Sequence, residues 1–319
     1  MTAVRAFALL VFLLALAGAA RGSVSGGTPT ALVTAETLDQ LIAVQMPCGR
    51  VVRRITLPAD PENVVANGSV AVVVSARGHA VTLVDVRRLR VLRVFRAFTS
   101  PHLAVITADN RYAYVTDDGA GRLVVIDLTK RRIVRSLYVG VGAHHLALAG
   151  AELWIALGER ASDVVVLDVA NEAAPRILVH FRPRTDVHSL AFAPSGDVWL
   201  TSDTEAYVTV VDPSTYRTVR RIPAGSPPQH VAFVDLPGWK AAYVTSGNDG
   251  VLRILDVRTG RLLRQVRIPT GSYNVETGGS FVLTSSLTQG TVTELTDRGR
   301  LVGQCRVAPA ARDAALVAR

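Results

Sequence analysis

The sequence is poor in several residue types and motifs, and each shortage removes a class of protein. Its 319 residues include two cysteines, two methionines and only two lysines, Lys130 and Lys240, despite a formal net charge of +9. It has no Cys-x-x-Cys-His motif for covalent haem, no glycine-rich phosphate loop and no Gly-x-Ser-x-Gly turn. Covalent haem attachment, P-loop nucleotide binding and α/β-hydrolase catalysis are therefore excluded.

Long apolar runs are also missing, except for one at the N-terminus. Arg5 precedes the unbroken apolar run 7–16, and the small residues Ala17-Gly18-Ala19 follow it as a cleavage site. The run is too short to span a bilayer comfortably, which favours a secretory signal over the alternative of an uncleaved anchor. We expect a signal peptide at 1–20, a short linker at 21–28, and a secreted or periplasmic mature protein without a transmembrane segment.

Helical periodicity is absent after residue 20. The chain is 49% hydrophobic and 19% charged, and its valine-rich apolar runs are short and bounded by turn residues. The stretch 101–140 shows the pattern in full. It predicts strands at 102–106, 112–116, 122–128 and 132–139, separated by the turn sequences ADN, DDGAG and DLTKR. A four-stranded unit of this kind cannot bury both of its faces, so it needs copies of itself on either side.

Two independent markers show that these copies exist. The predicted end of the third strand falls at Gln45, Asp85, Asp127, Asp168, Asp212, Asp256 and Glu294. The predicted end of the second strand falls at Thr34, Ser75, Thr116, Ala156, Thr201, Thr245 and Thr284. Both markers repeat about every forty residues. Seven four-stranded antiparallel units of this period predict an all-β, seven-bladed β-propeller over residues 29–319, in one domain.

The two ends of the chain predict how the ring closes. The first repeat begins at 30–34 with what is already a second strand, so it lacks an innermost one. The C-terminal segment 312–317 resembles the first strands of other repeats, such as 229–233. We expect Asp313–Val317 to pair with Ala31–Thr34 and complete blade 1, which would leave no open edge. A closed ring of this kind is expected to be monomeric.

The second strands carry a family signature. Tyr114-Val115-Thr116-Asp117 and Tyr243-Val244-Thr245-Ser246 resemble the YVTN repeat of exported prokaryotic β-propellers, the YncE-like family. The resemblance extends over all seven repeats, although no blade keeps the Asn of the motif and blade 4 reads Trp154-Ile155-Ala156. It implies the fold but not one activity, because the family includes binding proteins, maturation factors and cofactor enzymes.

The repeated aspartates Asp85, Asp127, Asp168, Asp212 and Asp256 are candidates for a structural role only. Each precedes a tight turn such as DLTK or DPST, where an Asp side chain accepts backbone N–H groups. Because they are spread one per blade around the ring, they cannot form an acid–base pair.

The starts of the innermost strands are the candidate functional positions. Aligning the repeats places polar residues at one mouth of the channel: Asn63, His102, His145, Ser189 with the preceding His188, His230, Asn274 and Asp313. Neutral imidazoles bind transition metals and a carboxylate can complete such a site, so His102, His145, His230 and Asp313 are a candidate set for a divalent metal. His144 and His79 are expected on the same face, and His180 on an outer strand. The alternative is that these histidines bond neighbouring loop backbone, as in WD40-type repeats.

The positive charge has two interpretations. Arginines recur in the predicted outermost strands, for example Arg90, Arg93 and Arg96 or Arg261, Arg264 and Arg267. Charged residues on an exposed edge strand prevent edge-to-edge pairing, which favours a solvated rim. A site for nucleic acid or another anionic polymer is the alternative, and a patch on one side only would favour it.

Two cysteines in an exported protein suggest a disulfide. Cys48 precedes the outer strand of blade 1 and Cys305 lies in the outer strand of blade 7, which are neighbours in a closed ring. We therefore predict a Cys48–Cys305 bond that joins the first and last blades.

These observations leave three classes of function open. The preferred interpretation is an exported binding or scaffold module at the cell envelope, with a small molecule or protein bound at the channel mouth. The second is a metal-dependent lyase, lactonase or oxidoreductase that uses the His/Asn/Asp ring. The third is an anionic-polymer binder that uses the arginine-rich rim.

Overall fold

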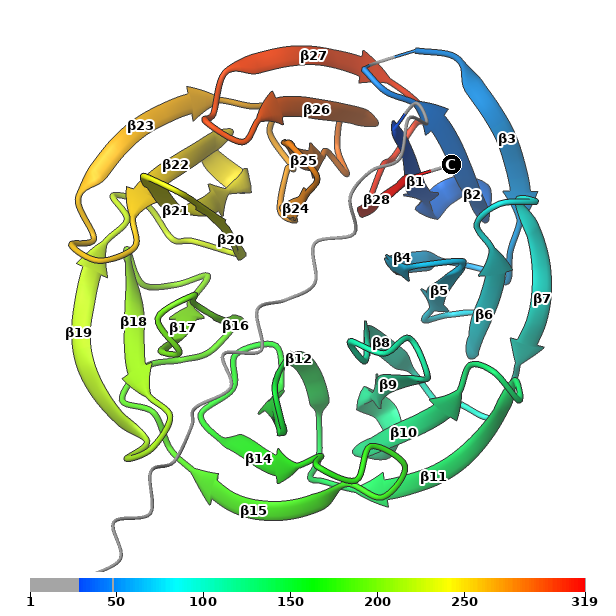
Figure 1. The fold of residues 1–319 in the computed structure, drawn as a ribbon, viewed down its shortest axis with the longest axis horizontal. Helices are drawn as coiled ribbons and strands as arrows, with labels where there is room; N and C mark the ends of the chain where they lie inside the picture. Colours follow the sequence, from blue (N-terminus) through cyan, green and yellow to red (C-terminus); the bar gives the residue numbers. More distant parts are fainter. Residues whose placement is uncertain (1–28, 48, 319) are drawn as a thin grey trace, which may run out of the picture.

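The described residues of this computed structural model, 29–47 and 49–318, form a ring of seven blades around a central channel. Each blade is a four-stranded antiparallel sheet, and Figure 1 shows the blades following one another around the ring in chain order. The predicted seven-bladed β-propeller is therefore confirmed. The predicted signal peptide and linker lie outside the described residues. Within these two ranges, no helix is long and apolar enough to cross a membrane.

In each blade the four strands follow one another from the channel outward. Blade 1 contains β28 (Ala314–Ala318), β1 (Pro29–Ala35), β2 (Gln40–Gln45) and β3 (Val51–Thr56). Blade 2 contains β4 (Pro61–Asn67), β5 (Val70–Ser75), β6 (Ala80–Asp85) and β7 (Arg90–Phe95). Blade 3 contains β8 (Pro101–Ile106), β9 (Tyr112–Asp117), β10 (Arg122–Asp127) and β11 (Arg132–Tyr138). Blade 4 contains β12 (Ala143–Ala149), β13 (Glu152–Leu157), β14 (Val164–Asp168) and β15 (Arg176–Phe181).

The remaining three blades have the same order of strands. Blade 5 contains β16 (Ser189–Phe192), β17 (Val198–Thr201), β18 (Tyr207–Asp212) and β19 (Arg217–Pro223). Blade 6 contains β20 (Val231–Leu236), β21 (Trp239–Ser246), β22 (Val251–Asp256) and β23 (Leu262–Arg267). Blade 7 contains β24 (Glu276–Gly278), β25 (Phe281–Ser285), β26 (Thr291–Thr296) and β27 (Leu301–Arg306). Short 3₁₀ turns η1 (Glu36–Leu38), η2 (Asp118–Ala120) and η3 (Gly247–Asp249) follow the second strands of blades 1, 3 and 6.

The C-terminal strand closes the ring, as the sequence predicted. β28 pairs antiparallel with β1, so that Ala315 lies opposite Leu32 and Val317 opposite Thr30. Just before β28, the Asp313 backbone N–H donates to the Thr34 hydroxyl at 2.9 Å. Blade 1 is thus built from both ends of the described chain, and its innermost edge is covered.

The core lies between neighbouring blades. Seven clusters of buried apolar side chains fill the seven interfaces, one for each pair of adjacent blades. The tyrosines of the YVTN-like motifs belong to these interfaces, and each hydroxyl donates to a turn in the next blade: Tyr114 to the Glu172 carbonyl at 2.9 Å and Tyr243 to the Asp297 carbonyl at 2.6 Å. Burial raises the pKa of Tyr243 to about 12. The motif therefore has a structural explanation, because its aromatic ring fills an interface and its hydroxyl fixes the adjacent blade.

The repeated aspartates cap turns, as predicted, and one assignment needs correction. The Asp85 carboxylate accepts the backbone N–H groups of Arg87 and Arg88, and the other four aspartates each accept one or more from the turn that follows. Glu294, placed in the same register from sequence, lies inside β26 and is fully buried. Thr296 takes the turn position, because its hydroxyl accepts the backbone N–H groups that follow it.

The predicted Cys48–Cys305 disulfide includes Cys48, which lies outside the described residues, so the bond stays a prediction. Cys305 lies on β27 and packs against the apolar cluster shared by blades 7 and 1. Thiol labelling of the folded protein without reductant tests the bond.

The arginines of the rim are spread around the described part of the ring. They lie on or beside the outermost strands of every blade, and several are paired with acidic residues, such as Arg176 with Asp168 at 2.9 Å. This distribution gives no patch on a single side and fits an edge that avoids pairing with other edges.

Candidate metal centre

The central channel holds a cavity of about 610 Å³ at the end where the innermost strands begin. Seven of the eight predicted channel residues line it: Asn63, His102, His145, His188, His230, Asn274 and Asp313. Ser189, the eighth, is buried and pairs with Thr201 on β17 instead. His144 lines the cavity too, whereas His79 is exposed and bonds the Thr99 carbonyl, and His180 lies on the outer strand β15. The cavity therefore contains five histidines, not the six that the sequence allowed.

The registers of these residues differ from the predicted alignment. In four blades the threonine near the end of the second strand has a hydroxyl group that bonds the backbone of one residue on or just before the innermost strand. The residues bonded in this way occupy the same position of the repeat. They are Leu103, Ser189, His230 and Asp313. His102 therefore stands one position before His230 and Asp313, and it is not in their register.

Two consecutive positions thus reach the cavity in blades 2, 3 and 4. In blades 2, 3 and 4 the first strand carries a β-bulge at this point, between Pro61 and Asn63, between Pro101 and Ala104, and between Ala143 and Leu146. A bulge adds a residue to one strand and re-aims its side chain. This geometry lets both His144 and His145 line the cavity, which strict strand alternation does not predict.

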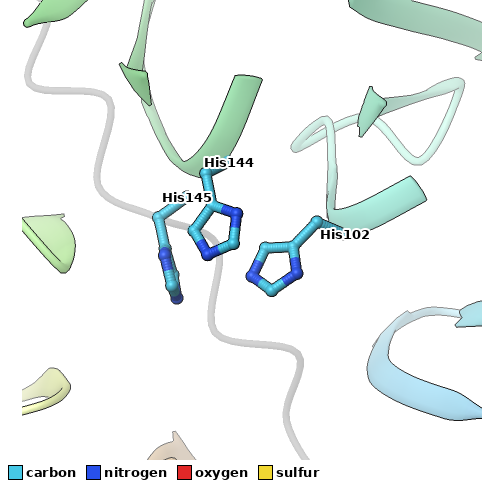
Figure 2. Close-up of side chains that lie close together, drawn as sticks. All are labelled: His102, His144 and His145. Atoms are coloured by element: carbon cyan, nitrogen blue, oxygen red, sulfur yellow. The ribbon is translucent and has the colours of Figure 1, made fainter. Parts of the chain in front are cut away.

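Five imidazoles meet in the cavity, and we call His102, His144, His145, His188 and His230 the five-histidine cluster. His102 and His144 stack with ring centroids 3.6 Å apart and an interplanar angle of 11°. His145 lies at the centre, 4.8 to 5.0 Å from the other four rings. Figure 2 shows His102 from blade 3 pointing toward His144 and His145 from blade 4.

The cluster contains two groups with metal-ligand spacing. His102, His144 and His145 form the first triad, and His145, His188 and His230 form the second. In each triad, ring nitrogens lie within 4.8 Å of one another. Among the described residues, the buried nitrogens Nε2 of His102, Nδ1 of His145 and Nδ1 of His188 have no hydrogen-bond partner. Buried polar atoms normally have one, so these nitrogens are candidates for a ligand.

Two carboxylates stand behind the first triad. Nδ1 of His144 lies 2.8 Å from Oδ2 of Asp118, the first residue of η2, and Nδ1 of His102 lies 3.4 Å from Oε2 of Glu62. A carboxylate that accepts from Nδ1 of an imidazole leaves Nε2 as the lone-pair donor, an arrangement common at metal sites. The turn that presents Asp118 ends at Gly121, where a Cβ would lie 2.5 Å from the Gly140 carbonyl oxygen.

The surroundings of four of the imidazoles disfavour their protonated form. Burial lowers the pKa of His102 and His188, and it lowers the pKa of His145 and His230 well below the ordinary value, with the neighbouring histidines adding to the effect. The pKa of Asp118 is lowered by the hydrogen bond with His144. Burial raises the pKa of Glu62, but the hydrogen bond from His102 and the nearby positive charge of Arg312 together outweigh it, and the net shift is downward. The cluster thus holds His102, His145, His188 and His230 in the uncharged form, and anionic carboxylates lie behind His102 and His144.

The other predicted polar residues hold neighbouring blades together. The Asn63 amide donates to Oδ2 of Asp313 at 2.8 Å, and its Oδ1 accepts the Ala104 backbone N–H at 3.0 Å. Oδ2 of Asp313 also accepts the Val64 N–H, and the Asn274 amide donates to the Arg312 carbonyl. The structure does not bring Asp313 into either histidine triad.

Two cavity carboxyls have raised pKa values. Burial raises the pKa of Asp313 to about 6, although its hydrogen bonds oppose the shift. Glu276, at the start of β24, is accessible to water within the channel but enclosed by the blades. This enclosure, with the Asp313 charge, raises its pKa to about 8. The histidine side and the carboxyl side of the cavity therefore differ in chemistry.

Comparison with known proteins supports the fold. The family model described as the cytochrome D1 heme domain matches residues 65–172, about a third of the chain, and no curated protein matches the sequence. The matched segment includes His102, His144 and His145.

Several solved structures share the propeller. Apo AztD from Citrobacter koseri has a TM-score of 0.70 and 14% identity, with 91% of this chain and 98% of that chain covered. A protein of unknown function from Desulfotomaculum acetoxidans has a TM-score of 0.76 and 13% identity, covering 90% and 98%. The dihydro-heme d1 dehydrogenase NirN in complex with DHE has a TM-score of 0.66 and 15% identity, covering 88% of this chain and 64% of NirN. At these identities the likeness concerns the fold.

Proposed function

We propose that this protein is an exported β-propeller of the YVTN-repeat, YncE-like type that binds a transition-metal ion in its central channel. The observation that carries the proposal is the five-histidine cluster, in which ligand nitrogens lie within 4.8 Å of one another in each triad. Imidazole nitrogens suit Zn²⁺, Cu, Ni²⁺ and Fe, and three of them leave positions open on the ion. The protein would act as a binding module at the cell envelope.

The burial of the cluster supports a ligand over a structural role. A histidine kept for loop bonding has its ring nitrogens satisfied by backbone groups, as Nδ1 of His79 is by the Thr99 carbonyl. In contrast, His145 is buried and its Nδ1 has no partner among the described residues. Placing five imidazoles together costs desolvation and gives few hydrogen bonds, which an ion would offset.

The residues fit an ion better than a tetrapyrrole. The match to the heme-domain model raises the question of a haem, and His102, His144 and His145 lie in the matched segment. A tetrapyrrole is a flat disc that needs clear space around its one or two axial ligands. Here every imidazole of the cluster has another ring centroid within 5.0 Å, and His102 stacks on His144 at 3.6 Å. We therefore derive no role for such a group.

Export rests on the sequence. The predicted signal peptide at 1–20 and the repeats Tyr114-Val115-Thr116 and Tyr243-Val244-Thr245 support an extracytoplasmic protein. The arginine-rich rim supports an anionic-polymer binder less well, since its charges are spread over the outer strands of the described blades.

Metal analysis and titration test the proposal. Protein purified from the exported fraction, then freed of metal with a chelator, is titrated with Zn²⁺ or Co²⁺. We expect one ion per chain and a higher melting temperature with the ion, and we expect His145→Ala to lose both effects. A wild-type protein that binds neither ion and melts identically with and without chelator contradicts the proposal.

A second candidate function is a metal-dependent enzyme, and Glu276 is the observation that favours it. Its carboxyl group faces the same cavity, and with a pKa of about 8 it is largely protonated at neutral pH. A carboxyl group with such a pKa can act as a general acid toward a substrate activated by the ion. Turnover of lactones or related esters that requires both the ion and Glu276 would support this alternative.

A further inference from the structure

The two histidine triads share one side chain, and this limits how they are filled. His145 belongs to both, and its ring centroid lies 5.0 Å from His102 and 5.0 Å from His230. A neutral imidazole has one lone-pair nitrogen, so His145 can ligate one ion at a time. The cluster therefore offers two alternative positions for an ion, one on each side of His145.

The two positions differ in charge. Behind the first triad stand Glu62 and Asp118, bonded to His102 and His144. Together they carry two negative charges, which offset the charge of a divalent ion held there, and the nearby Arg312 is itself paired with Glu36 at 3.5 Å. Behind the second triad, Asp203 acts on His188, but its Oδ2 is bonded to Arg160 at 3.3 Å. Glu159 also acts on His188 and is exposed to solvent, which screens its charge.

We propose that a divalent ion resides in the first triad and that the second triad is a weaker, alternative position, reached by ligand exchange at His145. The inference rests on the proposed metal-binding function. It adds which side chains hold the ion and which second set of side chains can take the ion over. Burying two positive charges without a nearby counter-charge is costly, and carboxylates lower that cost more at the first triad, because Asp118 and Glu62 contact its imidazoles directly whereas Asp203 is paired with Arg160. The second triad, made of neutral imidazoles, suits a monovalent soft ion such as Cu⁺ better than a divalent one.

A matched pair of histidine variants separates the two positions. His102→Ala removes a ligand of the first triad only, and His230→Ala removes a ligand of the second triad only. We expect His102→Ala to weaken Co²⁺ binding by about a hundredfold or more and to change its visible absorption spectrum, because the ion moves to the second triad. We expect His230→Ala to weaken Co²⁺ binding by less than about threefold and to leave the spectrum unchanged.

A matched pair of carboxylate variants tests the charge argument. Asp118→Asn and Asp203→Asn are isosteric changes at carboxylates that act on His144 and His188. We expect Asp118→Asn to weaken Co²⁺ binding by about tenfold or more, the effect expected of a group behind a metal ligand, and Asp203→Asn to have little effect. For Cu⁺, we expect Asp118→Asn to weaken binding less than it does for Co²⁺.

The outcomes distinguish this inference from the proposed function. If wild-type protein binds no Co²⁺, the proposed function fails. If it binds one ion but His230→Ala and Asp203→Asn weaken binding as much as their partners do, the assignment to the first triad is wrong and metal binding stands. Two ions bound at once would contradict the shared role of His145. The melting temperature of each metal-free variant serves as the control for folding. If the metal-free Asp118→Asn variant is unstable, Asp118→Glu replaces it in the test. This variant keeps the charge, and we expect it to recover part of the affinity.

Discussion

The two sides of the cavity use equivalent positions of the repeat in different ways. On the side of blades 7, 1 and 2, Asn274, Asp313 and Asn63 each bond the neighbouring blade. On the side of blades 3 to 6, the starts of the inner strands carry the five-histidine cluster, whose ring nitrogens are largely unpartnered or backed by carboxylates. A polar residue at the channel mouth is therefore not evidence of a ligand site. A candidate ligand position is distinguished by a side-chain atom that has no hydrogen-bond partner, whereas a structural position has its polar atoms bonded to the next blade.

This difference reflects how a propeller holds its ring together. The first and last repeats must be joined by non-covalent contacts, and the polar side chains of Asp313 and Asn63 reinforce that junction from blade 1 through blade 2 to blade 3. Blades 3 to 6 follow one another along the chain, and in blades 3, 5 and 6 a threonine hydroxyl of the second strand donates to the next blade, as Thr116 does to the His144 carbonyl at 2.6 Å. Their channel side chains are released from this structural role and available for a ligand.

The largest effect is expected from removing the junction on the cross-linked side. Deleting residues 310–319 removes β28, including the buried Ala314, Ala315 and Val317, and the Asp313 bonds to blade 2. At about 1.5–3 kcal/mol for a large buried apolar side chain and less for Ala, plus the lost strand pairing, we expect on the order of 5 kcal/mol. This corresponds to roughly 8 °C in melting temperature, at about 2.1 cal/mol/K of unfolding entropy per residue. A truncated protein that melts like the full chain contradicts the role of β28.

The closure and the period were predictable from sequence because both follow from local pattern. Turn residues recur about every forty positions, and the strands predicted at 102–106 and 112–116 are observed as β8 (Pro101–Ile106) and β9 (Tyr112–Asp117). The side-chain chemistry of the turn aspartates was predictable too, because an Asx turn is local. Glu294 was misassigned because its neighbours match a strand end, whereas its burial depends on the packing of blade 7 against blade 1.

The candidate site was predictable in place but not in membership. The alignment located the channel mouth, yet outside blades 4 and 5 it took one residue per blade to face inward, and the bulges in blades 2 and 3 bring in a second. His144 was expected on this face but was not in the predicted metal set, which contained Asp313 instead. The adjacent pair His144-His145 was the available signal for the second residue. Successive residues of a regular strand point to opposite faces, so two neighbouring histidines can serve one site only where the strand is irregular.

The comparison of the two sides predicts opposite effects from two matched substitutions. Asn63→Ala leaves the Ala104 N–H without its acceptor and removes a donor from Asp313, so we expect a loss of about 1–3 kcal/mol for each buried group left unpaired. Metal affinity should change by less than about threefold, since no ligand is removed. For His145→Ala we expect near-normal stability of the metal-free protein and a loss of about a hundredfold or more in affinity.

Thermal unfolding of the metal-free proteins and Co²⁺ titration measure both quantities on the same samples. The distinction fails if Asn63→Ala abolishes metal binding while remaining folded. It also fails if His145→Ala is destabilised as much as Asn63→Ala, which would show that the imidazole has a structural role.

The smallest expected effect is a difference in pH dependence between the two sides in the metal-free protein. Four imidazoles of the cluster, those of His102, His145, His188 and His230, have pKa values below the ordinary value of about 6.5, so below that pH the unfolded chain binds more protons than the native one. Their contribution to stability is therefore present above about pH 6.5 and is lost as the pH falls below it. Asp313 and Glu276, with pKa values of about 6 and about 8, act in the opposite direction, because the native state holds protons that the unfolded state has released. Their contribution is lost as the pH rises from about 4 through those values.

Glu276→Gln isolates the carboxyl side of this balance, because glutamine resembles the protonated acid at every pH. We expect the melting temperature of this variant to match that of the wild type near pH 4, to exceed it increasingly as the pH rises toward 8, and to keep a constant excess above that value. The difference should be small, because the Glu276 side chain is in contact with water in the channel, which screens its charge. His145→Gln should show the reverse trend, with its melting temperature rising relative to the wild type as the pH falls below about 6.5. Melting curves of the three metal-free proteins across pH 4 to 9 give both trends. A difference between Glu276→Gln and wild type that does not change with pH would contradict the raised pKa of Glu276, and with it the chemical contrast between the two sides of the cavity.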